Sequence, residues 1–154
     1  MKGQHGVSKM ESGLQLDVLY QDSDLAKIRV SASNDVFGGT ADVYLGLGQL
    51  AEVAAQLEGF PTGFEDSREI TLGSFEPQSA GGGVSMRFYC VDRSGHAYVE
   101  TKIESDQDSA GKVQSAILLV PIEASAVDLF VDELRRVNSG RATTACLKTT
   151  APVR

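Results

Sequence analysis

Two stretches of alternating apolar and polar residues, Val84 to Cys90 and His96 to Ile103, can fold onto each other around Asp92-Arg93-Ser94-Gly95. Taking these residues as a loop, with Gly95 in the left-handed conformation, fixes the cross-strand partners. One face then pairs Cys90 with Ala97, Phe88 with Val99, Met86 with Thr101 and Val84 with Ile103. The other pairs Tyr89 with Tyr98 and Arg87 with Glu100, and such pairs stabilise antiparallel ladders by roughly 0.2 to 1 kcal/mol each. A shift of one residue would lose both patterns, so the sequence predicts this hairpin and its register.

The N-terminal half shows two further periods. Alternation over 14–20 and 28–32 predicts a first hairpin, and 40–45 predicts a third strand. The period then becomes helical, with the apolar stripe Leu47, Leu50, Val53, Ala54 and Leu57. Gly59 and Pro61 end this helix, and a fourth strand follows from Ile70 to Phe75. The segment 78–83, with three consecutive glycines, is predicted to be a flexible connection.

The C-terminal half predicts one more strand and a second helix. Val113 to Val120 is the expected strand, and because Ala116 to Leu119 is apolar on both faces, we expect it inside the sheet or beneath a helix. Pro121 is expected to open the helix, with Glu123 in its first turn and Arg135-Arg136 in its last. Its predicted stripe is Ile122, Ala126, Val127, Phe130, Leu134 and Val137.

This order of elements predicts the α+β class, as a two-layer sandwich. A mostly antiparallel sheet of about six to seven strands would carry two helices on one face. Segments 1–12 and 139–154, rich in Gly, Ser, Thr, Lys and Ala, are predicted to be disordered ends around a single domain at 13–138. The uncovered face of the sheet is expected to carry Arg87, Tyr89, His96, Tyr98, Glu100 and Lys102.

Charge and composition narrow the class of partner. The chain has 154 residues, 42% of them hydrophobic, and a formal net charge of −7. Residues 13–138 contain 20 of the 21 acidic side chains and nine of the 14 basic ones, so this body would repel nucleic acid and attract a basic protein. Neither a run of about 20 apolar residues nor the apolar core of a secretory signal is present, which favours a cytoplasmic protein without a membrane partner.

The two cysteines lie in different surroundings. Cys90 falls on the apolar hairpin face and Cys146 in the polar C-terminal segment. We expect a buried thiol and an incidental one, without a disulfide between them.

Gly46-Leu47-Gly48-Gln49-Leu50-Ala51 satisfies the dinucleotide-binding pattern between a predicted strand and helix. Glu65, Asp66 and Glu69 lie near the distance expected of the ribose-binding acid. However, Leu47 and Leu50 belong to the apolar stripe, and the other strands are joined by hairpins. Gly48 as a helix cap explains the same residues.

No metal site is predicted. Asp106 to Gly111 begins like a calcium loop, but Ala110 replaces an oxygen ligand and Ile117 stands where the bidentate acid belongs, so we interpret it as a solvated turn. The four His and Cys residues do not have the spacing of a zinc site.

His96 beside Asp92 resembles a base with its orienting carboxylate, and Ser94 lies between them. All three fall at an exposed turn where nothing in the sequence excludes water or forms an oxyanion hole. Asp92 more simply caps the turn, and we assign no catalytic residue.

Tyr and Arg are enriched at binding hot spots, so the expected uncovered face is either a partner-binding surface or a stabilised ordinary surface. We select Arg87, Tyr89, His96, Tyr98, Glu100 and Lys102 as candidate partner-binding residues.

Four pieces of the chain, spread over residues 36 to 137, together resemble the WapI-like immunity proteins of bacterial polymorphic toxin systems. They are Phe37-Gly38-Gly39, the helix from Leu50 to Pro61, the turn Asp92 to Val99, and the helix positions Val127, Phe130 and Leu134. The chain departs from that family's pattern at Gly46-Leu47-Gly48 and at Val120-Pro121-Ile122. The resemblance implies a non-enzymatic protein without a cofactor that neutralises a cognate toxin, and it transfers no catalytic residue.

The leading hypothesis is therefore an immunity-like protein that occludes a basic toxin domain. One alternative is a nucleotide-binding or enzymatic domain that uses the crevice at Gly46 to Gly48. The other is a homo-oligomeric structural module that pairs through the tyrosine face.

Overall fold

The computed structural model describes residues 12–150 and contains eight strands and two helices. In chain order they are β1 (Gly13–Gln21), β2 (Leu25–Ser33), β3 (Gly38–Gly46), α1 (Gln49–Leu57), β4 (Ser67–Gly73), β5 (Gly83–Cys90), β6 (His96–Glu104), β7 (Ser115–Glu123), α2 (Ala126–Asn138) and β8 (Thr144–Lys148). The α+β class is confirmed, with antiparallel pairing throughout and two helices. The segment 1–11, most of the predicted N-terminal disordered end, lies outside the described residues.

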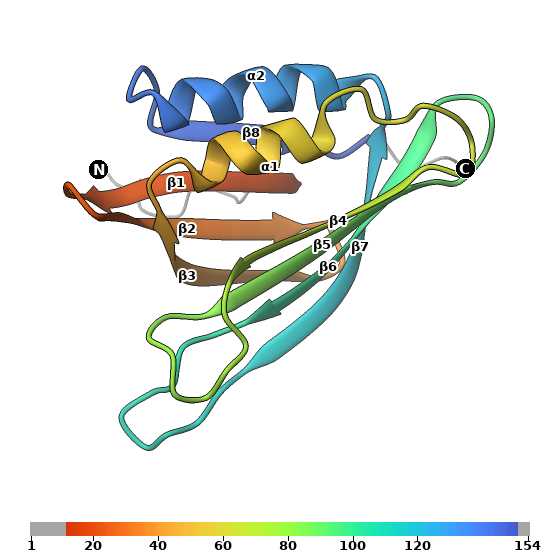
Figure 1. Cartoon of the computed structure of the whole chain (residues 1–154). Coiled ribbons are helices and arrows are strands. Elements are labelled where there is room, and N and C mark those ends of the chain that lie inside the picture. Colours follow the sequence, from red (N-terminus) through yellow and green to blue (C-terminus); the bar gives the residue numbers. More distant parts are fainter. Residues whose placement is uncertain (1–11, 151–154) are drawn as a thin grey trace, which may run out of the picture.

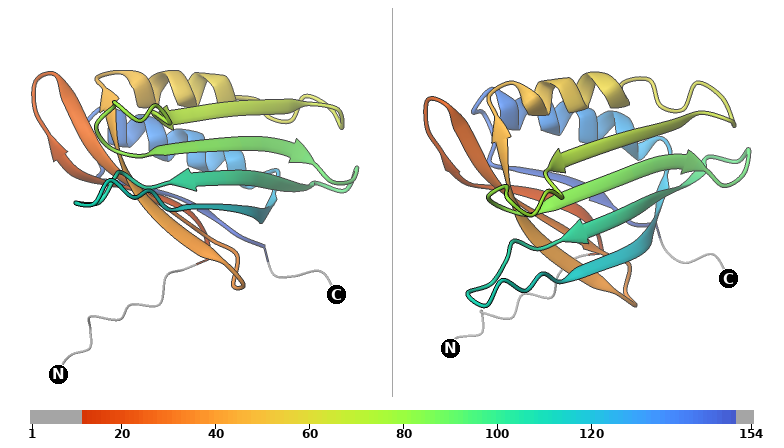
Figure 2. Two further views of the ribbon diagram at one scale, coloured as in Figure 1. Left: turned by 90° about the horizontal axis from the view of Figure 1, so that it is seen from below. Right: turned by 60° about the horizontal axis from the view of Figure 1, so that its bottom comes forward.

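The strands form two four-stranded sheets, which corrects the expected single sheet of six to seven. Sheet A has the order β3-β2-β1-β8 and sheet B the order β4-β5-β6-β7. The chain leaves sheet A through α1 and enters sheet B at β4, so each run of hairpins closes into its own sheet. Figure 1 shows α1 and α2 side by side, and Figure 2 shows α2 behind sheet B and α1 beside its edge strand β4.

One continuous hydrophobic core lies between the two sheets and the helices. β3 packs across sheet B and contacts all four of its strands. Phe88 on β5 is fully buried and meets Phe60 in an edge-to-face contact with ring centroids 6.0 Å apart. Each sheet therefore buries one face and turns the other outward, because alternate residues of a strand point to opposite faces.

The central hairpin has the predicted register. Phe88 pairs with Val99, Tyr89 with Tyr98 and Arg87 with Glu100. Gly95 has a φ of 91°, so the loop uses the left-handed residue that its length requires. This hairpin forms the two central strands of sheet B.

Pro121 lies in β7 opposite Tyr98, so the prediction that it opens α2 is wrong. β7 is an edge strand, and the carbonyl of Pro121 points away from β6 to accept hydrogen bonds from Thr149 Oγ1 (2.6 Å) and Thr150 N (2.9 Å). A proline is tolerated there because its missing N–H would face outward. The helix starts five residues later, and Ile122 is buried as part of the strand rather than of the helix.

Residues 139–150 also differ from the predicted disordered segment 139–154, of which 151–154 lie outside the described residues. β8 pairs with β1 and buries Ala145 and Leu147 in the core. Glu133 on α2 accepts a hydrogen bond from the backbone N–H of Cys146 at 2.7 Å. Only two inward apolar residues mark this strand. Such a short alternation does not stand out among the neighbouring Thr, Ala and Lys residues.

The segment Gly81 to Gly83 was predicted to be a flexible connection, but it passes close to the backbone of both sheets. The N–H of Gly82 donates to the carbonyl of Asp42 on β3 at 2.8 Å. A Cβ on Gly82 would lie 2.3 Å from the carbonyl oxygen of Glu104. Glycine is needed here for close backbone approach.

Helix α1 starts at Gln49 with Gly48 as its cap, at a φ of 85°, as predicted. Leu47 precedes the helix and is 53% exposed, so its place in the buried stripe was wrong. Within the described part of the chain, neither helix is long and apolar enough to cross a membrane.

Candidate functional site: the open face of sheet B

The outward side of sheet B, here called the open face, presents side chains from all four strands. Its members are Glu69 and Thr71 from β4, Ser85, Arg87 and Tyr89 from β5, His96, Tyr98, Glu100, Lys102 and Glu104 from β6, and Ile117, Leu119, Pro121 and Glu123 from β7. No helix or strand of the described chain lies over this side in either view of Figure 2. The six residues selected from the sequence share this one surface, and their role in binding stays a prediction.

Two aromatic rings and a guanidinium stack at the centre of the open face. The rings of Tyr89 and Tyr98 have centroids 6.0 Å apart and are tilted by 58°. The guanidinium carbon of Arg87 lies 4.3 Å from the centroid of the Tyr89 ring, within the range of a cation–π contact. Arg87 also makes an ion pair with Glu100 at 3.3 Å, in which both side chains are 44% exposed. The contacts hold these side chains in place, with the two rings half-buried and Arg87 and Glu100 more exposed.

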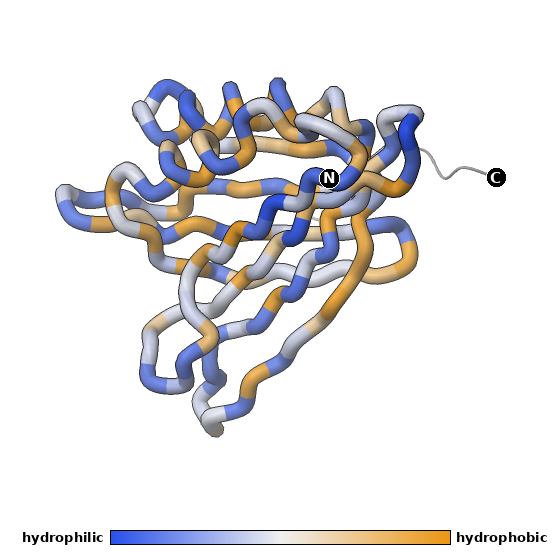
Figure 3. The backbone as a smooth tube through the Cα atoms, turned by 45° about the vertical axis from the view of Figure 1, so that its right-hand side comes forward, coloured by the Kyte–Doolittle hydropathy of each residue, from blue (hydrophilic) through white to orange (hydrophobic). Residues whose placement is uncertain are grey.

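Sequence reasoning missed the aliphatic margin that β7 adds to the open face. Ile117 is 66% and Leu119 40% exposed, whereas this apolar run was expected to be buried on both sides. β7 is an edge strand rather than a central one, which explains the difference. Figure 3 shows β7 as a nearly continuous hydrophobic stretch, while neighbouring strands alternate. The sequence did signal this region, because Ala116 to Leu119 is apolar on both faces of the strand. That pattern fits a fully buried strand and a strand with one exposed apolar face equally well.

A turn from sheet A is held against the edge strand β7. The side chain of Asn34 donates a hydrogen bond to the carbonyl of Leu119 at 2.8 Å and accepts one from the N–H of Phe37, also at 2.8 Å. The turn thus held against β7 carries Val36 and Phe37, which are 75% and 66% exposed. The turn, with its two exposed apolar residues, therefore lies at the β7 edge of sheet B.

Charge on the open face is mainly acidic. Glu69, Glu100, Glu104 and Glu123 outnumber the cations Arg87 and Lys102. Lys102 is drawn toward the ring of Phe75, with Nζ 4.9 Å from the centroid. The surface thus combines aromatic and aliphatic area with net negative charge.

His96 lies at the end of the open face between two carboxylates. Its Nδ1 is 2.7 Å from Asp92 Oδ2, and its Nε2 is 3.9 Å from Glu123 Oε1. The hydrogen bond to Asp92, followed by the nearby charges, raises the pKa of His96 above its ordinary value. The same contact, together with the N–H of Ser94, lowers the pKa of Asp92.

The structure places Asp92, Ser94 and His96 together in the exposed hairpin turn. Asp92 Oδ1 accepts from the N–H groups of Ser94 (2.7 Å) and His96 (3.4 Å), which is the predicted turn cap. The side chains of His96 and Asp92 are 36% and 45% exposed, so water reaches both. We therefore interpret the pair as a structural and electrostatic feature of the hairpin end.

The remaining predicted motifs lie outside the centre of the open face. Gly46 and Gly48 line a cleft with no charged side chain among its lining residues, and Gly46 also lines a shallower pocket with Glu69 and Thr71 of β4. The 106–111 loop is an exposed turn in which Asp108 Oδ1 accepts from the N–H groups of Ala110 and Lys112, both at 2.8 Å. Over residues 12–150 no three His, Cys, Asp or Glu side chains gather as metal ligands would.

The cysteines are both half-buried, and no disulfide links them. Cys90 lies beside the carbonyl of Gly63, and partial burial raises the pKa of its thiol, which disfavours a reactive thiolate. Cys146 belongs to β8 rather than to an unstructured segment.

Comparison with known proteins found no matching family model, no similar curated protein and no similar solved structure.

Proposed function

We propose that this chain is a non-enzymatic, immunity-like protein that binds a basic toxin domain through the open face of sheet B and neutralises it by occlusion. The observation that carries the proposal is the half-exposed cluster of Arg87, Tyr89 and Tyr98, flanked by the exposed Ile117 and Leu119. Aromatic and arginine side chains surrounded by apolar area are typical of the centre of a protein interface.

Charge supports a basic partner. Four glutamates and two cations lie on the open face, and the whole chain has 21 acidic against 14 basic side chains. A basic domain would be steered toward this body, and the association rate would fall as salt is raised. Occlusion needs no catalytic group on this chain.

A matched pair of tyrosine variants tests the proposal. Tyr98 lies on the open face, whereas Tyr20 is 53% exposed on the outward side of sheet A. The wild-type protein, Tyr98→Ala and Tyr20→Ala would each be used to capture partners from the native cell. The captured protein would then be purified for measurement of its dissociation constant. We expect Tyr98→Ala to weaken binding by about 30-fold, as at a hot spot, and Tyr20→Ala to leave it within about threefold.

The second part of the test asks whether the protein protects cells from the captured partner. Expression of the captured partner alone should arrest growth, and co-expression with wild-type protein or Tyr20→Ala should restore it, whereas Tyr98→Ala should not. Equal binding by both variants, or a partner that is harmless when expressed alone, would contradict the proposal. Light scattering that shows a dimer lost in Tyr98→Ala would instead assign this face to self-association.

A further inference from the structure

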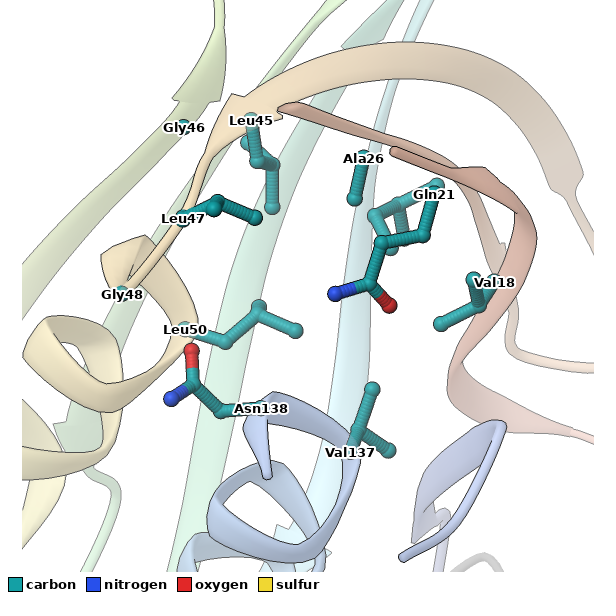
Figure 4. Close-up of a pocket in the computed structure, with 11 residues that line it drawn as sticks. Val18, Gln21, Ala26, Leu45, Gly46, Leu47, Gly48, Leu50, Val137 and Asn138 are labelled. Atoms are coloured by element: carbon teal, nitrogen blue, oxygen red, sulfur yellow. The ribbon is translucent and has the colours of Figure 1, made fainter. Parts of the chain in front are cut away.

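A cleft that contains no open-face residue lies where the end of the first hairpin meets the start of α1 and the end of α2. It has a volume of about 260 Å³. Its lining residues are Val18, Gln21, Ala26, Ile28, Leu45, Gly46, Leu47, Gly48, Leu50, Val137 and Asn138. Figure 4 shows side chains from these separate elements directed toward a common space.

The floor of this cleft is part of the hydrophobic core. Ile28 and Leu45 are 1% and 2% exposed, and Leu50 and Val137 are also buried. Leu47 stands at the mouth, 53% exposed, just before the helix cap at Gly48. An apolar compound that entered would therefore exchange water for aliphatic contacts on several sides.

The backbone leaves this space open for identifiable reasons. The β1–β2 register shifts between Val18 and Tyr20, which marks a bulge at the cleft. Bulges bend a strand and commonly lie beside functional sites. Gly46 and Gly48 contribute no side chain, and a Cβ at either position would meet nothing within 4 Å.

Two carboxamides provide the polar groups of the cleft. In Figure 4 the carboxamide of Gln21, an exposed residue, is directed into the cleft, whereas that of Asn138 lies at the margin beside Leu50; neither side chain hydrogen-bonds to another group in the described part of the chain. A carboxamide both donates and accepts, so this pair suits a neutral group that does the same, such as a hydroxyl or a primary amide. No acidic, basic or histidine side chain lines the cleft, so a charged ligand would lose hydration without gaining a partner.

The volume of the cleft limits the size of the ligand. An apolar cavity of about 150 Å³ holds benzene, so a cleft of about 260 Å³ has room for roughly ten non-hydrogen atoms. We infer that this cleft binds a small uncharged amphipathic molecule, with an apolar body on Ile28, Leu45 and Leu50 and one hydroxyl or amide group at Gln21 or Asn138. This binding is independent of the proposed docking of a toxin on the open face.

Compounds of one size and different charge test the inference. 2-Phenylethanol would be compared with phenylacetate, 2-phenylethylammonium and ethylbenzene by two-dimensional NMR titration of the full chain. We expect saturable shifts for the alcohol at Ala26, Leu47, Gly48 and Val137, with a dissociation constant in the millimolar range or below. Both charged analogues should bind at least about tenfold more weakly, because their charge is not compensated in the cleft.

Two variants locate the site. Ala26→Leu places three extra carbons in the cleft and should weaken binding of the alcohol at least about tenfold, whereas the control Thr40→Leu, exposed on the neighbouring β3, should not change it. Asn138→Leu should reduce the preference for the alcohol over ethylbenzene by about fivefold.

If Ala26→Leu fails to fold, the shift map of the wild-type protein and the Asn138→Leu comparison still decide the question. Shifts centred outside the cleft, no saturation up to about 20 mM, or a charged analogue that binds as well as the alcohol would each overturn the inference.

Discussion

The outward faces of the two sheets use polar residues in different ways. On sheet A, Arg29 makes two hydrogen bonds to Asp42, at 2.8 and 3.1 Å. In the same row across the sheet, Asp17 accepts from Thr144 Oγ1 at 2.7 Å and from the carboxamide of Gln15 at 2.9 Å. The charged groups of sheet A are thus largely satisfied by their own neighbours.

Both sheets carry tyrosines on their outward faces, but the open face of sheet B satisfies its charges less fully and adds exposed aliphatic side chains from β7. Its ion pair, Arg87 with Glu100, is a single contact at 3.3 Å, and the neighbouring Leu119 is 40% exposed. A partner on sheet A would have to break good hydrogen bonds, whereas a partner on sheet B would mainly cover aromatic and aliphatic surface. The difference favours sheet B as the docking face.

The largest expected effect comes from two adjacent residues on opposite faces of β5. Phe88→Ala removes a fully buried ring and should lower the free energy of unfolding by about 3 to 5 kcal/mol. Tyr89→Ala, on the open face, should lower it by about 1 kcal/mol or less. Urea denaturation of both variants measures the contrast. Similar losses would show that the open face is needed for stability and would weaken its assignment to binding.

A second prediction concerns the polar cluster at the start of β4, in which Asp66 forms an ion pair with Arg68. Arg68 donates to Asp66 at 2.8 and 2.7 Å and to the carbonyls of Gln56 and Glu58 at the end of α1. The guanidinium lowers the pKa of Asp66 to about 2, so its stabilisation is present above about pH 4 and is lost as the pH falls through about 2. Asp66→Asn should cost about 2 kcal/mol at pH 7.

Unfolding free energies between pH 2 and 7 measure this effect. The control Asp24→Asn removes an exposed carboxylate from the β1–β2 turn and should change stability by less than about 0.5 kcal/mol. An acid dependence that is the same in wild type and Asp66→Asn would rule out this role of the cluster.

Within sheet B, the sequence predicted the parts that are set by local pairing. The turn at Gly95 and the alternation on both sides of it specify each cross-strand pair, because any slip exposes Phe88 or buries a charge. The six candidate residues were therefore placed on one face correctly. What they bind is not encoded in that periodicity.

Long-range features could not be predicted in the same way. The separation into two sheets depends on how α1 redirects the chain after β3, and β8 returns from the C-terminal end to pair with β1. Pro121 satisfies the rule for a helix start and also the rule for an edge strand, and its pairing with Tyr98 at the edge of sheet B shows which applies. The cleft at Gly46 combines residues from three separate segments, and its lack of charge follows only from their arrangement.

A third prediction compares the two ion pairs directly. Double-mutant cycles should give a coupling of about 0.5 to 1 kcal/mol for Arg29 with Asp42 and about 0.5 kcal/mol or less for Arg87 with Glu100. The hydrogen bonds from Arg29 lower the pKa of Asp42, which agrees with the stronger coupling. Equal couplings would remove the proposed difference between the satisfied face and the open one. Raising the salt concentration should reduce both values.

The smallest effect is expected at His96, at the end of the open face. Its pKa is raised mainly by the hydrogen bond to Asp92, so the pair stabilises the fold below the ordinary pKa of histidine, about 6.5. This contribution disappears as the pH rises through the raised pKa of the folded state. An NMR titration should show a lower pKa of His96 in Asp92→Asn and a smaller decrease in Glu123→Gln, because Glu123 lies farther away at 3.9 Å. The reverse order would mean that Glu123 controls His96, and the positive charge at this end of the open face would then depend on β7 rather than on the hairpin turn.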